Sequence, residues 1–297
     1  MHKIKTFFKK YGIFYLFILP DYFFFTLFLL VPIIMSIFMS FEHYSFTKGI
    51  LHSNFVGFSN FISLFNDPIF HSALINTIIF TVVTVPYGII IALVLASLIN
   101  SFSASVQSIF RSAFYLPGVI SGVILSMAWI WIFDPSVGLA NTILSFLHLP
   151  TLYWLHSPTT SLLSIMLSSM LMAPGGSIIL YLAGMSRIPR EYYEAAELDG
   201  ATSFQKWMYI TIPLLEPTTL FLLVTNTIGS FQVFTSVYVM TSGGPGYSSD
   251  VLGYDIYNRA FNFYNFSQAS AEALILWAFV GIFAFFEFRR FSKMVKF

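Results

Sequence analysis

The chain has 297 residues, of which 57% are hydrophobic, 19% are aromatic and only 9% are charged. A soluble globular chain carries about 25% charged residues, so the composition excludes a single water-soluble core and predicts an all-α membrane protein. The formal net charge of +1 creates no field that would attract nucleic acid, and the lack of cysteine excludes disulfides, thiolate metal ligands and cysteine nucleophiles.

Six apolar stretches are long enough to cross a bilayer, because a spanning helix needs roughly 20 apolar residues. The first follows a basic segment, residues 1–12, and is about twice as long as the hydrophobic region of a signal peptide. We therefore expect it to be a retained helix. The six predicted spans are 13–41, 74–99, 108–133, 159–185, 214–240 and 269–288.

The basic residues are divided unequally between the two sides that six spans would create. One side would hold 12 of the 14 Lys and Arg residues, and the other only Lys48 and Arg259. The positive-inside rule then places both termini, 1–12 and 289–297, in the cytoplasm and makes 42–73, 134–158 and 241–268 external. The 12 residues are Lys3, Lys5, Lys9, Lys10, Arg111, Arg187, Arg190, Lys206, Arg289, Arg290, Lys293 and Lys296.

Ionisable residues are rare within the predicted spans. Asp21 lies in the first, Glu272 and Glu287 lie near the ends of the sixth, and the middles of the other four contain none. Intramembrane ionisable groups mark proton and ion pathways. A stand-alone, ion-coupled secondary transporter is therefore a disfavoured alternative, and a non-transporting membrane scaffold is a third possibility.

Motifs of soluble enzymes are absent from the sequence. It contains no Gly-x-x-x-x-Gly-Lys phosphate loop, no His-Glu-x-x-His and no Gly-x-Ser-x-Gly, and its six His residues lack metal-ligand spacing. We expect no catalytic residue, no metal site and no cofactor bound by this chain.

Segment 186–213, on the predicted cytoplasmic side, has an unusual composition. Four of the 13 acidic residues fall within nine positions, and Pro189 precedes them where it suits a helix start. Gly200 can adopt a positive φ and end that helix. Thr202 with Gln205 forms the pattern of a capping box for a second helix, which Pro213 is expected to end. The four acidic residues are Glu191, Glu194, Glu197 and Asp199.

The same segment resembles the EAA loop of binding-protein-dependent ABC importer permeases. The matching residues are Glu194-Ala195-Ala196, Gly200 after three intervening residues, and Ile210-x-Ile212-Pro213, where the family prefers Leu before the final Pro. Further stretches resemble the sugar-uptake branch in the same order along the chain. They are Val56-Gly57-Phe58-Ser59-Asn60-Phe61 with Asp67-Pro68, Asn76-Thr77, Tyr115-Leu116-Pro117, Trp131-Ile132-Phe133-Asp134-Pro135 with Gly138-Leu139-Ala140-Asn141, and Gly243-Gly244-Pro245 with Tyr257-x-x-Ala260-Phe261.

This resemblance implies a type I ABC importer permease fold, with one added helix before a five-helix core in 74–288. It implies a multi-pass protein of the bacterial cytoplasmic membrane that forms half of a carbohydrate pathway. The implied partners are membrane lipid, a second homologous permease, an extracytoplasmic substrate-binding protein and two ATPase subunits that bind ATP and Mg. The residues implied to couple to the ATPase are Glu191, Glu194, Ala195, Ala196, Asp199, Gly200 and Pro213.

The resemblance also points to substrate contacts in the two spans that flank this loop. Carried over by position, these are Ser169, Ala173 and Gly176 in the fourth span and Gly229, Ser230 and Val233 in the fifth, with Gln232 as a neighbouring polar residue. The aromatic and Asn residues that contact sugar in related permeases are not matched at these positions. The sequence does not identify the carbohydrate.

Overall fold

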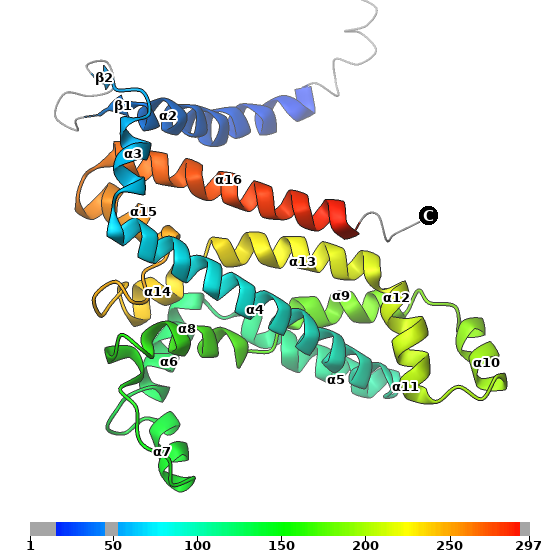
Figure 1. The fold of residues 1–297 in the computed structure, drawn as a ribbon. Coiled ribbons are helices and arrows are strands. Elements are labelled where there is room, and N and C mark those ends of the chain that lie inside the picture. Colours follow the sequence, from blue (N-terminus) through cyan, green and yellow to red (C-terminus); the bar gives the residue numbers. More distant parts are fainter. Residues whose placement is uncertain (1–15, 45–52, 292–297) are drawn as a thin grey trace, which may run out of the picture. The chain divides into compact units, whose positions relative to one another are not determined.

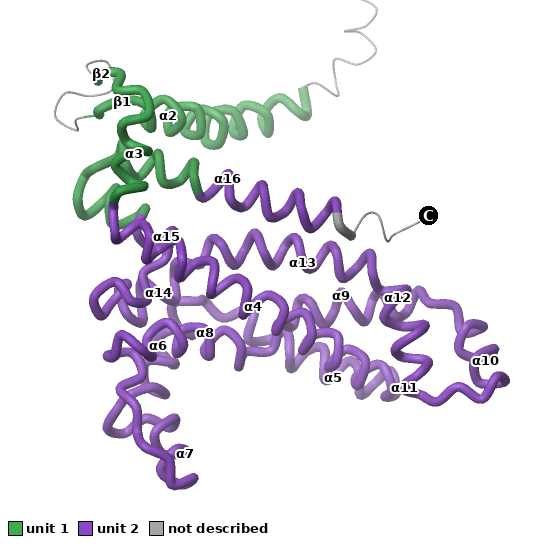
Figure 2. Tube along the Cα trace, in the orientation of Figure 1, with its two compact units in different colours: residues 1–66, 256–275 green, residues 67–255, 276–297 purple. Residues whose placement is uncertain are grey.

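The structure is a computed structural model that describes residues 16–44 and 53–291 (Figure 1). The predicted basic segment 1–12 and residues 292–297 of the predicted tail lie outside this range. The chain divides into two compact units, 1–66 with 256–275 and 67–255 with 276–297 (Figure 2). We call these the first and the second unit.

The described residues contain five helices that are long and apolar enough to cross a membrane, and a bent helix pair provides a sixth candidate span. The prediction of an all-helical membrane protein is therefore confirmed, whereas the cytoplasmic placement of the termini stays a prediction. The five helices are Leu16–Ser40, Pro68–Asn100, Ser161–Met185, Glu216–Met240 and Phe266–Arg289, and the bent pair is Ala104–Val119 with Gly122–Ile132.

The first unit contains the described residues 42–44 and 53–66 of the predicted external loop 42–73. Strand β1 pairs antiparallel with β2, in register Glu42 with Phe55, and helix α3 follows. The buried Asn60 amide donates to the carbonyls of Ser40 (2.8 Å) and Glu42 (3.0 Å), which gives this residue a structural role. The elements are η1 (Thr26–Leu30), α2 (Val31–Ser40), β1 (Glu42–His43), β2 (Asn54–Phe55) and α3 (Ser59–Phe65).

The first unit also contains a buried ion pair between Arg259 and Glu272. Arg259 Nε lies 2.9 Å from Glu272 Oε2, with side-chain exposures of 7% and 0%, and Arg259 Nη1 donates to Gln268 Oε1 at 3.2 Å. Removing one partner of a buried ion pair leaves the other charge buried without compensation, which costs about 3–5 kcal/mol of stability. Arg259, which the sequence places on the external side, is thus neutralised inside the protein. Nearby elements are α15 (Leu252–Tyr257), η6 (Asn258–Asn262) and α16 (Phe266–Phe291).

The second unit is built around α4, α9 and α13, which share a buried hydrophobic core. Ala92 and Ala96 of α4 are fully buried, and their small side chains allow the helices to approach closely. Tyr181 of α9 and Leu215 before α13 fill the space between them. The elements are α4 (Pro68–Asn100), α5 (Ala104–Tyr115), η3 (Leu116–Val119), α6 (Gly122–Ile132), α7 (Leu139–Phe146), η4 (Trp154–His156), α8 (Ser161–Met170), α9 (Gly175–Met185), α10 (Arg190–Leu198), α11 (Ser203–Lys206), η5 (Trp207–Thr211), α12 (Ile212–Leu214), α13 (Glu216–Phe231) and α14 (Thr235–Met240).

Three of the predicted spans are broken helices. The third bends by 93° between η3 and α6, the fourth is interrupted between α8 and α9 beside Pro174, and the fifth between α13 and α14. Gly175 is required at its break, because a Cβ there would lie 2.2 Å from the Phe114 carbonyl oxygen. Irregular backbone at membrane depth is tolerated only where it is buried in protein or lines a cavity, so these breaks indicate where a site could lie.

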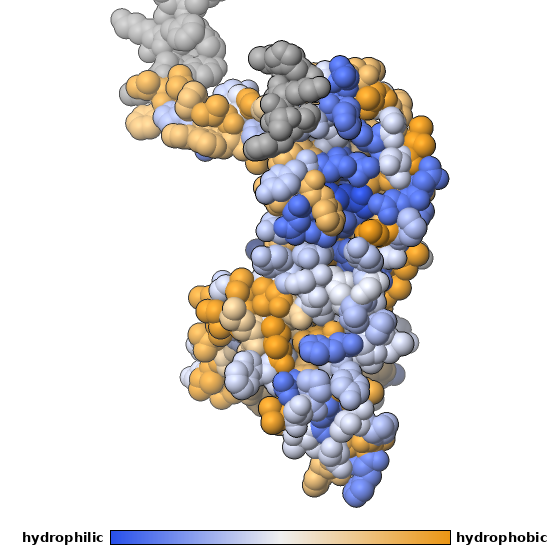
Figure 3. Space-filling view, turned by 90° about the vertical axis from the view of Figure 1, so that its left-hand side faces the viewer, coloured by the Kyte–Doolittle hydropathy of each residue, from blue (hydrophilic) through white to orange (hydrophobic). Residues whose placement is uncertain are grey.

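Two predicted external loops of the second unit are held by asparagine side chains. Asn141 of α7 donates to the carbonyls of Pro135 and Leu152 and accepts from the Leu152 amide and the Trp154 indole, at 2.8–3.1 Å. Asn76 of α4 donates to the carbonyl of Asp250 at 2.8 Å. Each asparagine is thereby a loop anchor. Figure 3 views the molecule from the left-hand side of Figure 1, and hydrophilic residues are gathered there between hydrophobic margins.

Candidate coupling helix and translocation cavity

The first helix of segment 186–213 forms as predicted. Helix α10 runs from Arg190 to Leu198, with Pro189 at its N-cap and Glu191 in its first turn. Gly200 follows with φ of +77°, a conformation that other residues adopt only at a cost of about 1–2 kcal/mol. The glycine therefore fixes a sharp reversal after the helix.

The second helix begins as predicted and ends at Leu214, one residue after Pro213. The capping box is present: the Thr202 amide donates to Gln205 Oε1 at 2.8 Å, and the Gln205 amide donates to Thr202 Oγ1 at 3.3 Å. The helix then continues through η5 and α12 to Leu214. The Ile212 amide donates to the Trp207 carbonyl, and this wider π turn accommodates the proline ring without a break. We call residues 189–214 the α10–α12 unit.

Helix α10 stands apart from the helix bundle, beside α11 (Figure 1). Tyr193 Oη lies 2.9 Å from Thr211 Oγ1, and Lys206 Nζ lies 3.5 Å from Glu197 Oε2. No residue of α10 is buried, and Leu198 is 90% exposed. A short, charged and uncovered helix of this kind has the properties of a protein-docking element.

Six of the seven predicted coupling residues lie on α10 or in the turn after it, whereas Pro213 lies in α12 at the other end of the second helix. Glu191, Glu194 and Ala195 are exposed on α10, and Ala196 is half-buried. A hollow of about 290 Å³ lies between α10 and the second helix. Its lining consists of Ala196, Asp199, Gly200, Ala201, Gln205, Lys206, Tyr209 and Ile210.

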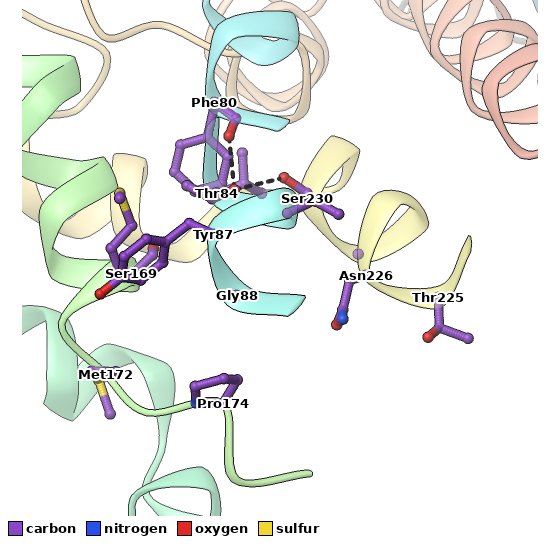
Figure 4. A pocket seen from close by; sticks show the side chains of 14 residues that line it. Phe80, Thr84, Tyr87, Gly88, Ser169, Met172, Pro174, Thr225, Asn226 and Ser230 are labelled. Carbon is purple, nitrogen blue, oxygen red and sulfur yellow. Dashed lines mark hydrogen bonds between the residues drawn. The ribbon is translucent and has the colours of Figure 1, made fainter. Parts of the chain in front are cut away.

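A cavity of about 370 Å³ lies in the second unit between α4, the α8–α9 break and α13 (Figure 4). This volume falls in the range of small-molecule sites, roughly 300–1,000 Å³. The broken fourth span supplies one wall, as expected for irregular backbone in a membrane. The lining consists of Phe80, Thr84, Val85, Tyr87, Gly88, Ser169, Met170, Met172, Pro174, Thr225, Asn226, Gly229, Ser230 and Val233.

The polar groups of the cavity are uncharged, and no acidic or basic side chain occurs among the described lining residues. Thr84 Oγ1 lies 3.3 Å from Ser230 Oγ and donates to the Phe80 carbonyl at 2.7 Å. Tyr87 extends from α4 toward Ser169 of α8, and Asn226 lies on α13 (Figure 4). The cavity can therefore offer hydrogen bonds and an aromatic ring, but no countercharge.

Four of the seven predicted pathway residues line this cavity: Ser169, Gly229, Ser230 and Val233. The other three do not. Ala173 packs instead against the hydrophobic core, Gly176 lies beyond the α8–α9 break, and Gln232 is exposed where α13 has ended. Ala173 and Gln232 are direct neighbours of lining residues. A shift of one residue along a broken span is thus enough to turn a side chain away from the cavity.

Sequence reasoning missed the whole α4 wall of the cavity. Phe80, Thr84 and Tyr87 follow one another at helical spacing and share a face of α4. A threonine at this spacing, followed by Pro86 and Tyr87 inside an apolar run, is a signal that could have indicated this wall. Thr225 and Asn226 of α13 were also missed as lining residues.

The comparisons with known proteins cover nearly the whole chain. The family model of the binding-protein-dependent transport system inner membrane component matches residues 85–292. The probable ABC transporter permease protein YurN of Bacillus subtilis is 34% identical over 88% of this chain and 90% of that protein. The lactose transport system permease protein LacF of Rhizobium radiobacter is 34% identical over 92% of both chains.

A solved structure extends the likeness to the fold. A bacterial ABC transporter involved in the import of the acidic polysaccharide alginate superposes with a TM-score of 0.86 at 26% identity, over 99% of this chain and 100% of that one. With the uncovered α10 helix and the broken spans, these matches identify an inner membrane permease rather than an ATPase. The chain belongs to the binding-protein-dependent transport system inner membrane components, the permease subunits of ABC importers.

Proposed function

We propose that this permease imports a neutral carbohydrate and that the cavity of the second unit is the part of the translocation pathway that this subunit forms. The uncharged lining carries the proposal, because an anionic ligand would lose its hydration there without gaining a countercharge. Hydroxyl and amide groups beside the Tyr87 ring suit a sugar, which presents both hydroxyl groups and apolar faces. The similarity to the lactose permease LacF supports a carbohydrate substrate. The structural relative takes part in the import of an acidic polysaccharide, but the uncharged lining of this cavity argues against an acidic substrate here.

The α10–α12 unit is the proposed contact with an ATPase subunit. Its exposed acidic and alanine residues form a helix that a partner groove can receive. In this proposal the side that carries α10 is cytoplasmic, two ATPase subunits bind ATP and Mg, and a second homologous permease completes the pathway. An extracytoplasmic binding protein delivers the substrate to the opposite side, as the family description implies.

The experiment has two steps, beginning with the cognate binding protein. The binding protein is first screened for binding of neutral and anionic mono-, di- and oligosaccharides. The complete transporter, in proteoliposomes with both permeases and both ATPase subunits, is then assayed for uptake of the bound sugars. We expect ATP-dependent uptake of a neutral sugar, and loss of uptake when any subunit is omitted. Binding and uptake of only anionic sugars would refute the proposal, and so would ion-driven uptake by this chain alone.

A further inference from the structure

A side-chain hydrogen bond joins the α10–α12 unit to helix α4. The indole Nε1 of Trp207 donates to the hydroxyl of Ser97 at 2.8 Å, although the two residues are 110 positions apart. The same hydroxyl donates to the Leu93 carbonyl at 2.7 Å, so the serine is fixed from both sides. Trp207 begins η5, and Ser97 lies in the last turn of α4.

Helix α4 connects this contact to the cavity. Tyr87 and Gly88 line the cavity ten and nine residues before Ser97, a helix length of about 15 Å. Pro86 precedes them inside α4 and cannot donate a helical hydrogen bond, which makes that point the natural place for the helix to bend. The part of α4 from Tyr87 to Ser97 is continuous helix after Pro86, and it packs in the hydrophobic core that α4 shares with α9 and α13.

The α10–α12 unit reaches the opposite cavity wall by a different route. Helix α12 continues through the buried Leu215 directly into α13, which carries Asn226 and Ser230. That connection is covalent and needs no side chain. The α4 wall is separated from the unit by 92 positions of chain, from Ser97 to Pro189. Its movement with the unit therefore depends on side-chain contacts, which are the apolar core around Leu215 and the polar bond from Trp207 to Ser97.

We propose that Trp207 and Ser97 are positioning residues whose hydrogen bond makes the α4 wall of the cavity follow the α10–α12 unit. The inference rests on the proposed function, in which an ATPase moves α10. ATP-driven displacement of α10 then moves both walls together, through the backbone into α13 and through Trp207 into α4. When the bond is missing, only the apolar packing of the core still joins α4 to α13. The α4 wall then follows the α10–α12 unit less closely, and fewer ATP cycles open the cavity to the other side.

The test uses the complete transporter in proteoliposomes with its binding protein and measures sugar taken up per ATP hydrolysed. Trp207→Phe keeps an aromatic ring, smaller than the indole, and removes the donor, and Ser97→Ala removes the acceptor. We expect each to lower the ratio roughly two- to ten-fold, the equivalent of one hydrogen bond, with ATPase association unchanged. The double variant should lose no more than either single one. Ser97→Thr, which keeps the hydroxyl, should restore the ratio.

Ser72→Ala is the matched control, because Ser72 lies on the same helix and donates in the same way to a carbonyl four residues earlier. It should leave the ratio unchanged. An unchanged ratio in both single variants, or losses that multiply in the double variant, would overturn the inference. Loss of ATPase association in Trp207→Phe would also overturn it, because Trp207 would then only support the docking surface, and the proposed function would stand.

A second measurement keeps the inference testable if uptake is too weak to quantify. The chain contains no cysteine, so a single Gly88→Cys reports on the α4 wall when the partner subunits are cysteine-free. Its reaction rate with a membrane-impermeant thiol reagent should change on ATP binding, and Trp207→Phe should abolish most of that change. An equal change in both backgrounds would refute the inference. Failure of the proposed function would appear differently, as no ATP effect in either background.

Discussion

The α10–α12 unit and the cavity belong to the same compact unit but differ in almost every physical property. Helix α10 has no buried residue and four acidic residues lie in or next to it, whereas the described cavity lining has no charged side chain. An exposed charged helix loses little hydration until a partner covers it, and an uncharged cavity in a membrane holds a neutral ligand without burying a charge. The contrast separates a protein-binding surface from a ligand-binding one.

The largest expected effect is at the exposed face of α10. Ala195→Lys preserves helix propensity but places an ammonium where the ATPase should cover the helix, and an unpaired buried charge costs about 3–5 kcal/mol. We expect ATPase subunits to be lost from the purified complex and uptake to fall about 100-fold or more. Ala195→Ser, which stays small and uncharged, is the control and should retain both. Intact association in Ala195→Lys would show that α10 is not the docking surface.

A smaller effect is expected in the cavity. Tyr87→Leu removes an aromatic face from the lining and should lower uptake about five- to ten-fold, since an aromatic contact contributes roughly 1 kcal/mol. ATPase association should be unaffected, unlike in the α10 variant. Tyr87→Phe keeps the ring and should retain most of the uptake. Equal losses in the Leu and Phe variants would indicate that the hydroxyl, rather than the ring, recognises the substrate.

Helix α9 runs between the two regions and offers a matched pair of glycines. A Cβ at Gly184 would lie 2.8 Å from Leu215 Cδ2 and 2.9 Å from Thr218 Oγ1, whereas a Cβ at Gly176 would contact nothing within 4 Å. Gly184→Ala should therefore destabilise the protein by about 1–2 kcal/mol and lower the melting temperature by a few degrees. Gly176→Ala should leave it unchanged or slightly raised, because alanine favours the helix. Thermal melting of the solubilised complex measures both, and equal shifts would contradict the close packing at Gly184.

Local chemistry explains why the α10–α12 unit could be predicted and the α4 wall could not. The capping box of Thr202 and Gln205 and the turn at Gly200 depend on residues within a few positions of one another, so the sequence shows them directly. The cavity depends on contacts such as Thr84 with Ser230, 146 residues apart, which no local pattern encodes.

The ion pair between Arg259 and Glu272 illustrates a further limit. Counting charges assigns Arg259 correctly to a segment between two predicted spans but treats it as isolated. Its partner lies 13 residues later, inside the predicted sixth span, and both side chains are buried. Only the fold shows that the basic residue compensates an acidic one within the protein and is not available to an anionic substrate.

The smallest expected effect is at the weaker of the two contacts that hold α10 to the second helix. Glu197 is 74% exposed and its oxygen lies 3.5 Å from Lys206 Nζ, so Glu197→Gln should change uptake by less than about two-fold, because exposed ion pairs contribute roughly 0.2–1 kcal/mol. Raising the salt concentration should erase even that difference. Tyr193→Phe removes the part-buried hydrogen bond to Thr211 and should cost more, without salt dependence. If Glu197→Gln were instead the more damaging change at every salt concentration, the carboxylate would have to act in the ATPase contact itself, and the charge of α10 rather than its shape would determine docking.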